Sequence, residues 1–220
     1  MSLGLDPQLG RLLQLASATL PIGTYAYSDG LETAVERGWV TDEEETLAWL
    51  TGRLYHQLAR VDLPILARLY DGGDITLWTQ RLRAMRDSAE ARYADRSMGQ
   101  ALLRLLGDLG LEEANPWRTA PTACPALGFA LAGRAWALDR EVLLGAYAWS
   151  YGEGQVAAAV KLVPLGQTAG QRILSRWGAL LPEVVSTSLD LKDDELGTCA
   201  PHAAIASAWH EHQTVRLFRS

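Results

Sequence analysis

Cysteine is scarce in this chain, since Cys124 and Cys199 are its only two among 220 residues. Small secreted domains depend on several disulfides, and two distant cysteines cannot supply such a framework. A chain of 220 residues needs none, because it can bury roughly 70% of the surface that it exposes when unfolded. The sequence therefore predicts two free thiols in a reducing compartment.

We expect neither an export signal nor a membrane-spanning helix, and basic residues are not in surplus. Its first residues show no basic and apolar leader pattern. The apolar run at 156–165 contains Lys161 and Pro164 and falls well short of the roughly 20 residues that a spanning helix needs. With 20 Lys and Arg against 26 Asp and Glu, the net charge is -6, which disfavours nucleic acid and anionic lipid as partners. We expect a cytoplasmic protein whose partners are proteins, with no membrane and no nucleic acid among them.

Motifs of the common enzyme classes are missing too. There is no phosphate-binding loop, no Gly-x-Ser-x-Gly elbow and no His-Glu-x-x-His helix. On a helix, His210 and His212 would lie about 200° apart and could not share one ion. The less favoured alternative is a metal site formed by the histidines of this segment. We expect no enzyme, no cofactor and no metal site, and we expect Tyr147, Trp149 and Tyr151 to form core and subunit contacts rather than a ligand site.

Leu and Ala recur at spacings of three and four residues along nearly the whole chain, and alternating strand patterns are absent. The sequence predicts an all-α fold, a single domain over residues 1–220 that forms a bundle of roughly eight to ten helices. The helices that we expect after the first two cover residues 41–61, 62–71, 75–86, 88–109, 125–136, 140–163, 167–181 and 201–213.

Polar residues mark several of these helix starts. Thr41 followed by Glu44 fits a capping box. Asp62, just before a proline, is expected to begin a separate helix, and Asp74 and Asp139 are expected to cap theirs.

The most informative segment is residues 161–171, which read Lys-Leu-Val-Pro-Leu-Gly-Gln-Thr-Ala-Gly-Gln. Lys161 follows a wholly apolar run, so it must either reach water or carry a desolvation cost. After the Pro-x-Gly break, Gln167 and Gln171 lie four residues apart on one helical face. The segment fits either a kinked core helix with a surface lysine or a corner that faces a partner.

Two further segments accompany this corner. Residues 20–32 read Leu-Pro-Ile-Gly-Thr-Tyr-Ala-Tyr-Ser-Asp-Gly-Leu-Glu, and residues 210–220 read His-Glu-His-Gln-Thr-Val-Arg-Leu-Phe-Arg-Ser. Together the three segments resemble those of the urease accessory protein UreF family, and the similarity extends over nearly the whole chain. The chain departs from the usual family pattern at Ala26, Asp29, Thr214 and Val215.

This resemblance implies a helical, usually dimeric protein that binds the accessory protein UreD, also called UreH. That pair recruits the GTPase UreG, docks on apo-urease and promotes nickel insertion. By resemblance the chain is a non-catalytic scaffold that couples the GTPase cycle to metallocentre assembly. The alternative is a nickel-binding metallochaperone in its own right.

The resemblance also assigns residues. It places Lys161, with Tyr25 near it, on the surface that faces UreG, and it makes the C-terminal Arg-Leu-Phe-Arg-Ser part of the contact with UreD or UreH. We expect this tail to be a docking peptide that frays when unbound, rather than a cap on the core of the protein. The expected partner-binding residues are Tyr25, Lys161, Gln167, Gln171, His210, Glu211, Arg216, Leu217, Phe218 and Arg219.

Overall fold

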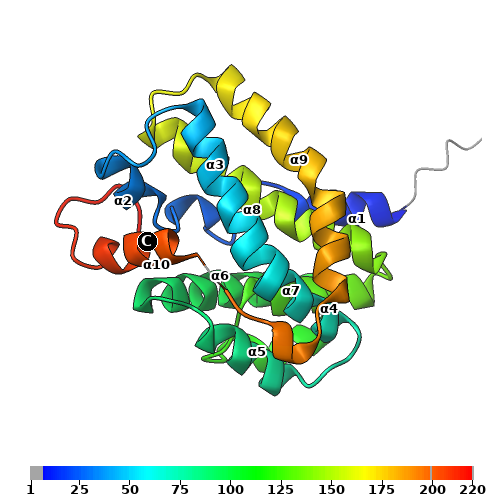
Figure 1. Cartoon of the computed structure of the whole chain (residues 1–220). Coiled ribbons are helices and arrows are strands. Elements are labelled where there is room, and N and C mark those ends of the chain that lie inside the picture. Colours follow the sequence, from blue (N-terminus) through cyan, green and yellow to red (C-terminus); the bar gives the residue numbers. More distant parts are fainter. Residues whose placement is uncertain (1–6, 199, 220) are drawn as a thin grey trace, which may run out of the picture.

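The computed structural model describes residues 7–198 and 200–219, and within them the chain forms ten α-helices and no strand (Figure 1). The all-helical prediction is confirmed. The α-helices are α1 (Pro7–Ala16), α2 (Leu31–Glu36), α3 (Glu43–Arg53), α4 (Leu63–Tyr70), α5 (Ile75–Ala84), α6 (Ala89–Asp108), α7 (Pro125–Ala135), α8 (Arg140–Leu162), α9 (Gln167–Asp190) and α10 (Pro201–His210). Four further helical segments, three of them 3₁₀ and η2 a π-helix, are η1 (Thr24–Ala26), η2 (Leu54–Asp62), η3 (Glu112–Trp117) and η4 (Asp193–Glu195).

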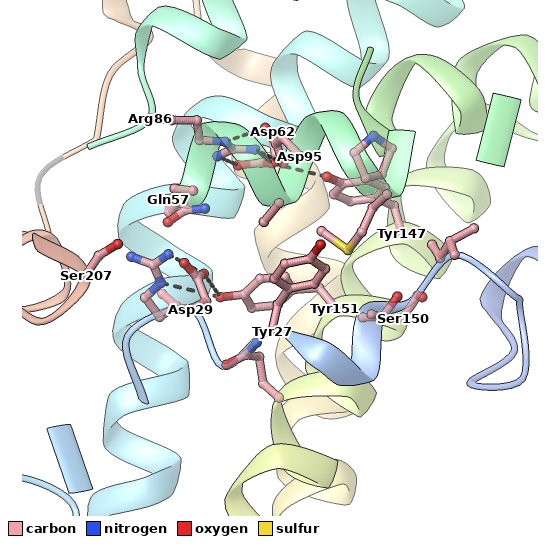
Figure 2. A pocket seen from close by; sticks show the side chains of 18 of the residues that line it. Tyr27, Asp29, Gln57, Asp62, Arg86, Asp95, Tyr147, Ser150, Tyr151 and Ser207 are labelled. Carbon is pink, nitrogen blue, oxygen red and sulfur yellow. Dashed lines mark hydrogen bonds and ion pairs between the residues drawn. The ribbon is translucent and has the colours of Figure 1, made fainter. Parts of the chain in front are cut away.

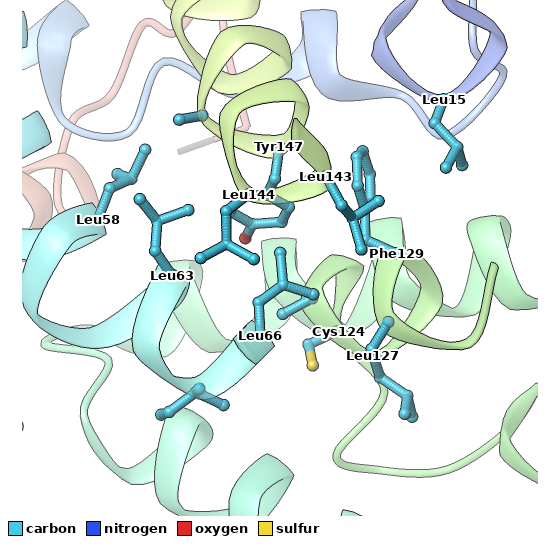
Figure 3. Packing of buried hydrophobic residues seen from close by; sticks show 14 of the residues in the cluster. Leu15, Leu58, Leu63, Leu66, Cys124, Leu127, Phe129, Leu143, Leu144 and Tyr147 are labelled. Carbon is cyan, nitrogen blue, oxygen red and sulfur yellow. The ribbon is translucent and has the colours of Figure 1, made fainter. Parts of the chain in front are cut away.

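Helix α8 runs through the middle of the bundle and contacts α1, α4, α7 and α9 (Figure 1). Its apolar face packs against leucines of α4 and against α7, where Phe129 meets Tyr147 edge to face (Figure 3). Gly152 lets α9 approach closely, because a Cβ at this position would lie 2.4 Å from the ring of the fully buried Trp177. Small residues on α8 therefore set the spacing of the central helix pair.

Most predicted helix starts are confirmed. Asp74, Ser88 and Asp139 each accept a hydrogen bond from the backbone N–H three residues on, and so cap α5, α6 and α8. The capping box at Thr41 is wrong by one residue. Asp42 is the cap of α3, and the reciprocal carboxylate belongs to Glu45, which accepts hydrogen bonds from the backbone and hydroxyl of Thr41.

The predicted helix boundary at Asp62 is also wrong. The chain continues without a break from α3 through η2, a π-helical segment, into α4. Asp62 keeps right-handed helical backbone angles and caps nothing. Pro64 lies inside this continuous helix, where the hydrogen-bonding pattern changes from the π-helical η2 to α4. The Asp62 side chain forms a buried ion pair with Arg86.

Two predicted helix ends differ as well. Helix α9 continues past the expected end at residue 181, with Pro182 inside it, and ends at Asp190. Beyond the proline, Val184, Val185 and Ser188 are buried, so packing of the far half outweighs the loss of one backbone hydrogen bond. Helix α10 ends three residues before the expected residue 213. Within the described residues, no helix has the length and apolar content to cross a membrane.

Candidate functional site: a junction of three segments

The three segments that the sequence singles out, residues 20–32, 161–171 and 210–219, meet beside α2, α10 and the end of α8. We call this place the junction, and residues 211–219 the tail. A small apolar cluster lies at its centre, in which Phe218 packs with Leu31 of α2 and with Ala159 and Val163 at the end of α8. Residues up to 187 positions apart in the sequence are thus packed into one cluster.

Glu32 forms the socket that holds the tail. Its Oε1 accepts a hydrogen bond from the backbone N–H of Leu217 at 2.6 Å. Its Oε2 accepts one from the backbone N–H of Phe218 at 3.0 Å and contacts Nε2 of His210 at 3.1 Å. The Glu32 residue is 7% exposed, so these donors replace the water that a carboxylate would otherwise need.

Further contacts tie the tail to its surroundings. Arg216 pairs with Glu90 of α6, with 2.5 Å between Nη1 and Oε1, and also donates to the backbone oxygens of Glu211 and Gln213. The backbone N–H of Arg219 donates to the oxygen of Ala26 at 2.8 Å, which joins the tail to η1. The tail is therefore held by backbone and side-chain bonds along its whole described length.

This arrangement contradicts the expectation that the tail frays when unbound. Phe218 is 5% exposed and belongs to the protein's own core. Leu217 points the other way and is 65% exposed, and Val215 is 83% exposed. The backbone bends at residues 217 and 218, so the Phe218 side chain enters the core cluster and anchors the tail while its neighbours remain on the surface.

Lys161 lies at the rim of the junction and is exposed. The preceding helix is not buried all round, because Ala157, one turn earlier, is also exposed. Of the two alternatives that the sequence left open, Lys161 therefore reaches water and carries no desolvation cost. Its Nζ lies 5.7 Å from the centroid of the Phe218 ring, within cation–π range, which links Lys161 directly to the tail.

The other predicted partner-binding residues differ in exposure. Tyr25 in η1 is 68% exposed, and Gln167 and Gln171 are exposed on the first turns of α9. In contrast, His210 is fully buried, and Glu211 accepts hydrogen bonds from the first N–H groups of α6. His210 and Glu211 are thus both bonded within the protein, and a contact of either residue with a partner stays a prediction.

A cavity of about 100 Å³, lined by both apolar and charged side chains, adjoins residues 22–29 (Figure 2). Asp29 lies on its wall, with φ at 53°, a left-handed conformation that non-glycine residues seldom adopt. Its carboxylate pairs with Arg53 and accepts a hydrogen bond from the hydroxyl of Tyr151 at 2.6 Å. Burial alone would raise the pKa of Asp29, but Arg53 and Tyr151 outweigh it and hold that pKa below its usual range. The ion pair thus fixes the turn between η1 and α2.

A second charged network lines the other side of the cavity. Arg86 pairs with Asp62 at 2.5 Å and with Asp95 at 2.7 Å, and the Tyr147 hydroxyl donates to Asp62 at 3.1 Å. Burial raises the pKa of Asp95 against the opposing pull of Arg86. These groups hold η2, α6 and α8 together through paired charges, and the oxygen Oε1 of the buried Gln155 has no protein partner at the cavity wall.

Sequence reasoning missed both networks, although one signal was present. Tyr147 and Tyr151 lie four residues apart and thus on one face of α8, and each hydroxyl reaches a carboxylate. The prediction that the aromatic residues here contact the core holds for Tyr147, which is buried. Among the residues that the structure describes, no group of three or more His, Cys, Asp or Glu is placed to hold a metal ion.

Comparison with known proteins decides the family. A sequence model of the UreF family matches residues 40–178. A urease accessory protein UreF of Alkalilimnicola ehrlichii is 49% identical over 228 aligned residues, which cover 100% of both chains. The chain belongs to the UreF family of urease accessory proteins. UreF proteins of Teredinibacter turnerae and Pseudomonas putida W619 are 42% and 44% identical, each over 98% of this chain and 100% and 99% of their own lengths.

The UreF family model covers only part of the junction. Residues 20–32 and 210–219 lie outside the part that the family model matches, whereas Lys161 lies inside it. The full-length UreF relatives nevertheless align over the whole chain, so the junction belongs to the region shared with them. This assignment confirms the resemblance stated from the three segments.

Proposed function

We propose that this chain promotes nickel insertion into apo-urease in the cytoplasm, as a non-catalytic scaffold between UreD or UreH and the GTPase UreG. It acts as a homodimer that couples the GTPase cycle to assembly of the metallocentre. Membership in a family of urease accessory proteins supports this proposal. The observation that carries it is the junction, where an exposed lysine and an exposed tyrosine flank a docked tail.

The junction offers two adjoining surfaces. One contains Lys161, Tyr25 and the glutamines of α9, and its cation and amides suit polar contacts with UreG. The other contains the exposed side chains of Val215 and Leu217. Val215 lines a surface hollow together with Trp209, which is 42% exposed. Aromatic and apolar anchors of this kind commonly carry much of the energy of a protein interface, so this second surface suits UreD or UreH.

Phe218 joins the two surfaces, because its ring lies in the core cluster below and within reach of Lys161 above. A partner that binds the outer side of the tail stabilises the docked position of Phe218. It thereby also stabilises the arrangement of Lys161 and, through the bond from Arg219 to Ala26, the segment that carries Tyr25. Binding at one surface would favour binding at the other, which is a coupling of two binding equilibria.

Lys161→Ala tests the proposal. The sequence contains one other lysine, Lys192, which is also exposed, so Lys192→Ala removes the same charge elsewhere on the surface. In cells that express the urease genes, a tagged Lys161→Ala chain should recover less UreG than the wild type, while Lys192→Ala should recover the normal amount. Circular dichroism should show the same helix content in all three proteins. Normal UreG recovery and normal urease activation by Lys161→Ala would refute the assigned surface.

The alternative, a chain that itself carries nickel, is tested separately. Equilibrium dialysis of the purified chain with Ni²⁺ should show no stoichiometric tight binding, and a phosphate-release assay with GTP should show no turnover. Tight nickel binding that mutation of the chain's own histidines abolishes would favour the metallochaperone instead.

A further inference from the structure

His210 occupies a position that the scaffold function does not require. It is the last residue of α10 and is fully buried. Its Nδ1 lies 2.7 Å from Oε2 of Glu90 on α6, and its Nε2 lies 3.1 Å from Oε2 of Glu32 on α2. Both ring nitrogens thus face carboxylate oxygens.

Both carboxylates accept hydrogen bonds from the tail. Glu32 accepts from the backbone N–H groups of Leu217 and Phe218. Glu90 accepts from Arg216 through its other oxygen. When both carboxylates are ionised they can only accept, so both contacts of the His210 ring are hydrogen bonds only when the ring is the doubly protonated imidazolium.

The charges around the ring lead to the same result. The groups that face it are Glu32 from α2, Glu90 from α6 and, through Glu90, Arg216 from the tail. Two carboxylates balance one guanidinium and one imidazolium. With a neutral ring, these four groups would carry one uncompensated negative charge. One nitrogen of the buried ring would also turn a lone pair toward a carboxylate, which is costly where solvent is absent.

We propose that His210 is a proton-dependent lock for the C-terminal tail. The imidazolium holds Glu32 and Glu90 in the orientation in which Glu32 binds the backbone of Leu217 and Phe218 and Glu90 binds Arg216. Loss of the ring proton removes one of these charge-assisted bonds and loosens the tail. Tail docking is therefore strongest in mildly acidic solution and weakens as the pH rises. The lock is a property of the isolated chain, and it holds whatever the tail binds.

Hydrogen–deuterium exchange of the purified full chain tests the lock. Protection of residues 211–219, corrected for the intrinsic pH dependence of exchange, is compared at about pH 6 and about pH 9, which bracket the usual charge change of histidine. We expect protection to fall about tenfold or more at the higher pH, as the loss of a charge-assisted hydrogen bond would cause. Amides in the middle of α8 serve as the internal control and should stay protected at both.

Glu90→Gln is the matched variant. The amide oxygen of the glutamine can still accept from Arg216, while its NH₂ group can donate to Nδ1 of a neutral His210 ring. The variant should keep its tail docked at both pH values. Equal tail protection in the wild type at both values, or the same pH dependence in a folded Glu90→Gln chain, would overturn the proposal.

Nitrogen NMR of the His210 ring provides a measurement that needs no variant. The ring should be doubly protonated at about pH 6 and should lose its proton in step with the loss of tail protection. A neutral ring beside a fully protected tail at both pH values would equally overturn the lock.

Discussion

Replacement of Phe218 by alanine gives the sharpest test of whether the tail is part of the folded core. The residue stands two positions before the end of the chain, yet its ring packs with Leu31, Ala159 and Val163 and is 5% exposed. A tail that docks only on a partner predicts no effect on the stability of the free chain. The structure predicts a clear loss.

The size of the loss follows from burial. Truncation of a core phenylalanine to alanine costs about 3–5 kcal/mol when its surroundings cannot relax. A terminal segment can shift to fill part of the cavity that remains, so we expect a smaller loss of about 2–3 kcal/mol for Phe218→Ala. The contact with Lys161 contributes about 0.5–1 kcal/mol to this sum. For a chain of this length, the melting temperature should fall by about 5–10 °C.

Urea unfolding followed by far-ultraviolet circular dichroism measures the free energy of unfolding directly. Leu217→Ala is the matched control, because Leu217 is adjacent but 65% exposed and its loss should change stability by less than about 0.5 kcal/mol. A Phe218→Ala chain as stable as Leu217→Ala would mean that the tail is not docked in the free protein.

Other positions lead to equally definite expectations. Gly152→Ala should lower the free energy of unfolding in urea by about 1–3 kcal/mol, because the new Cβ would lie 2.4 Å from the ring of Trp177. Gly145→Ala is the control on the same helix: the space around Gly145 is open, so this change should be neutral or stabilising. Asp29 has a lowered pKa in the folded protein, so its ionised form contributes stability at neutral pH that is lost as the pH falls through that pKa. In Asp29→Asn, the free energy of unfolding should therefore depend less steeply on pH between about pH 5 and pH 2. A pH dependence equal to that of the wild type would contradict the paired carboxylate. Burial raises the pKa of the Cys124 thiol to about 12, so mass spectrometry after iodoacetamide treatment at about pH 8 should find Cys124 unmodified in the native chain and alkylated in urea.

The helical class and most helix starts follow from local chemistry. Spacings of three and four residues report the apolar face of a helix, and Asp74 and Asp139 cap their helices because a carboxylate next to the first free N–H groups needs no distant partner. The boundaries that failed depended on distant residues. Asp62 resembles a helix cap in sequence, but Arg86 binds it, and Pro182 lies inside α9 because buried residues beyond it keep the helix together.

The candidate site shows the same division. Lys161 could be selected from the sequence because it is a lone cation after an apolar run. Tyr25 and the C-terminal Arg-Leu-Phe-Arg-Ser could be selected because they resemble segments of the UreF family. The roles of Glu32 and Glu90 could not, since an acidic residue in a helical stretch is nearly always solvated. Their function depends on the tail and on His210. Along the chain, His210 is 178 residues from Glu32 and 120 residues from Glu90.

The sequence by itself determined the helical class, most of the helix caps, the family and the three segments that matter. It could do so because helix propensity, capping and family similarity depend on neighbouring residues or on their order. Tertiary structure alone decided that Phe218 is buried while Leu217 is exposed, that Lys161 reaches water, and that His210 lies between two carboxylates. Burial and charge pairing depend on which distant surfaces meet, and no local pattern contains that information.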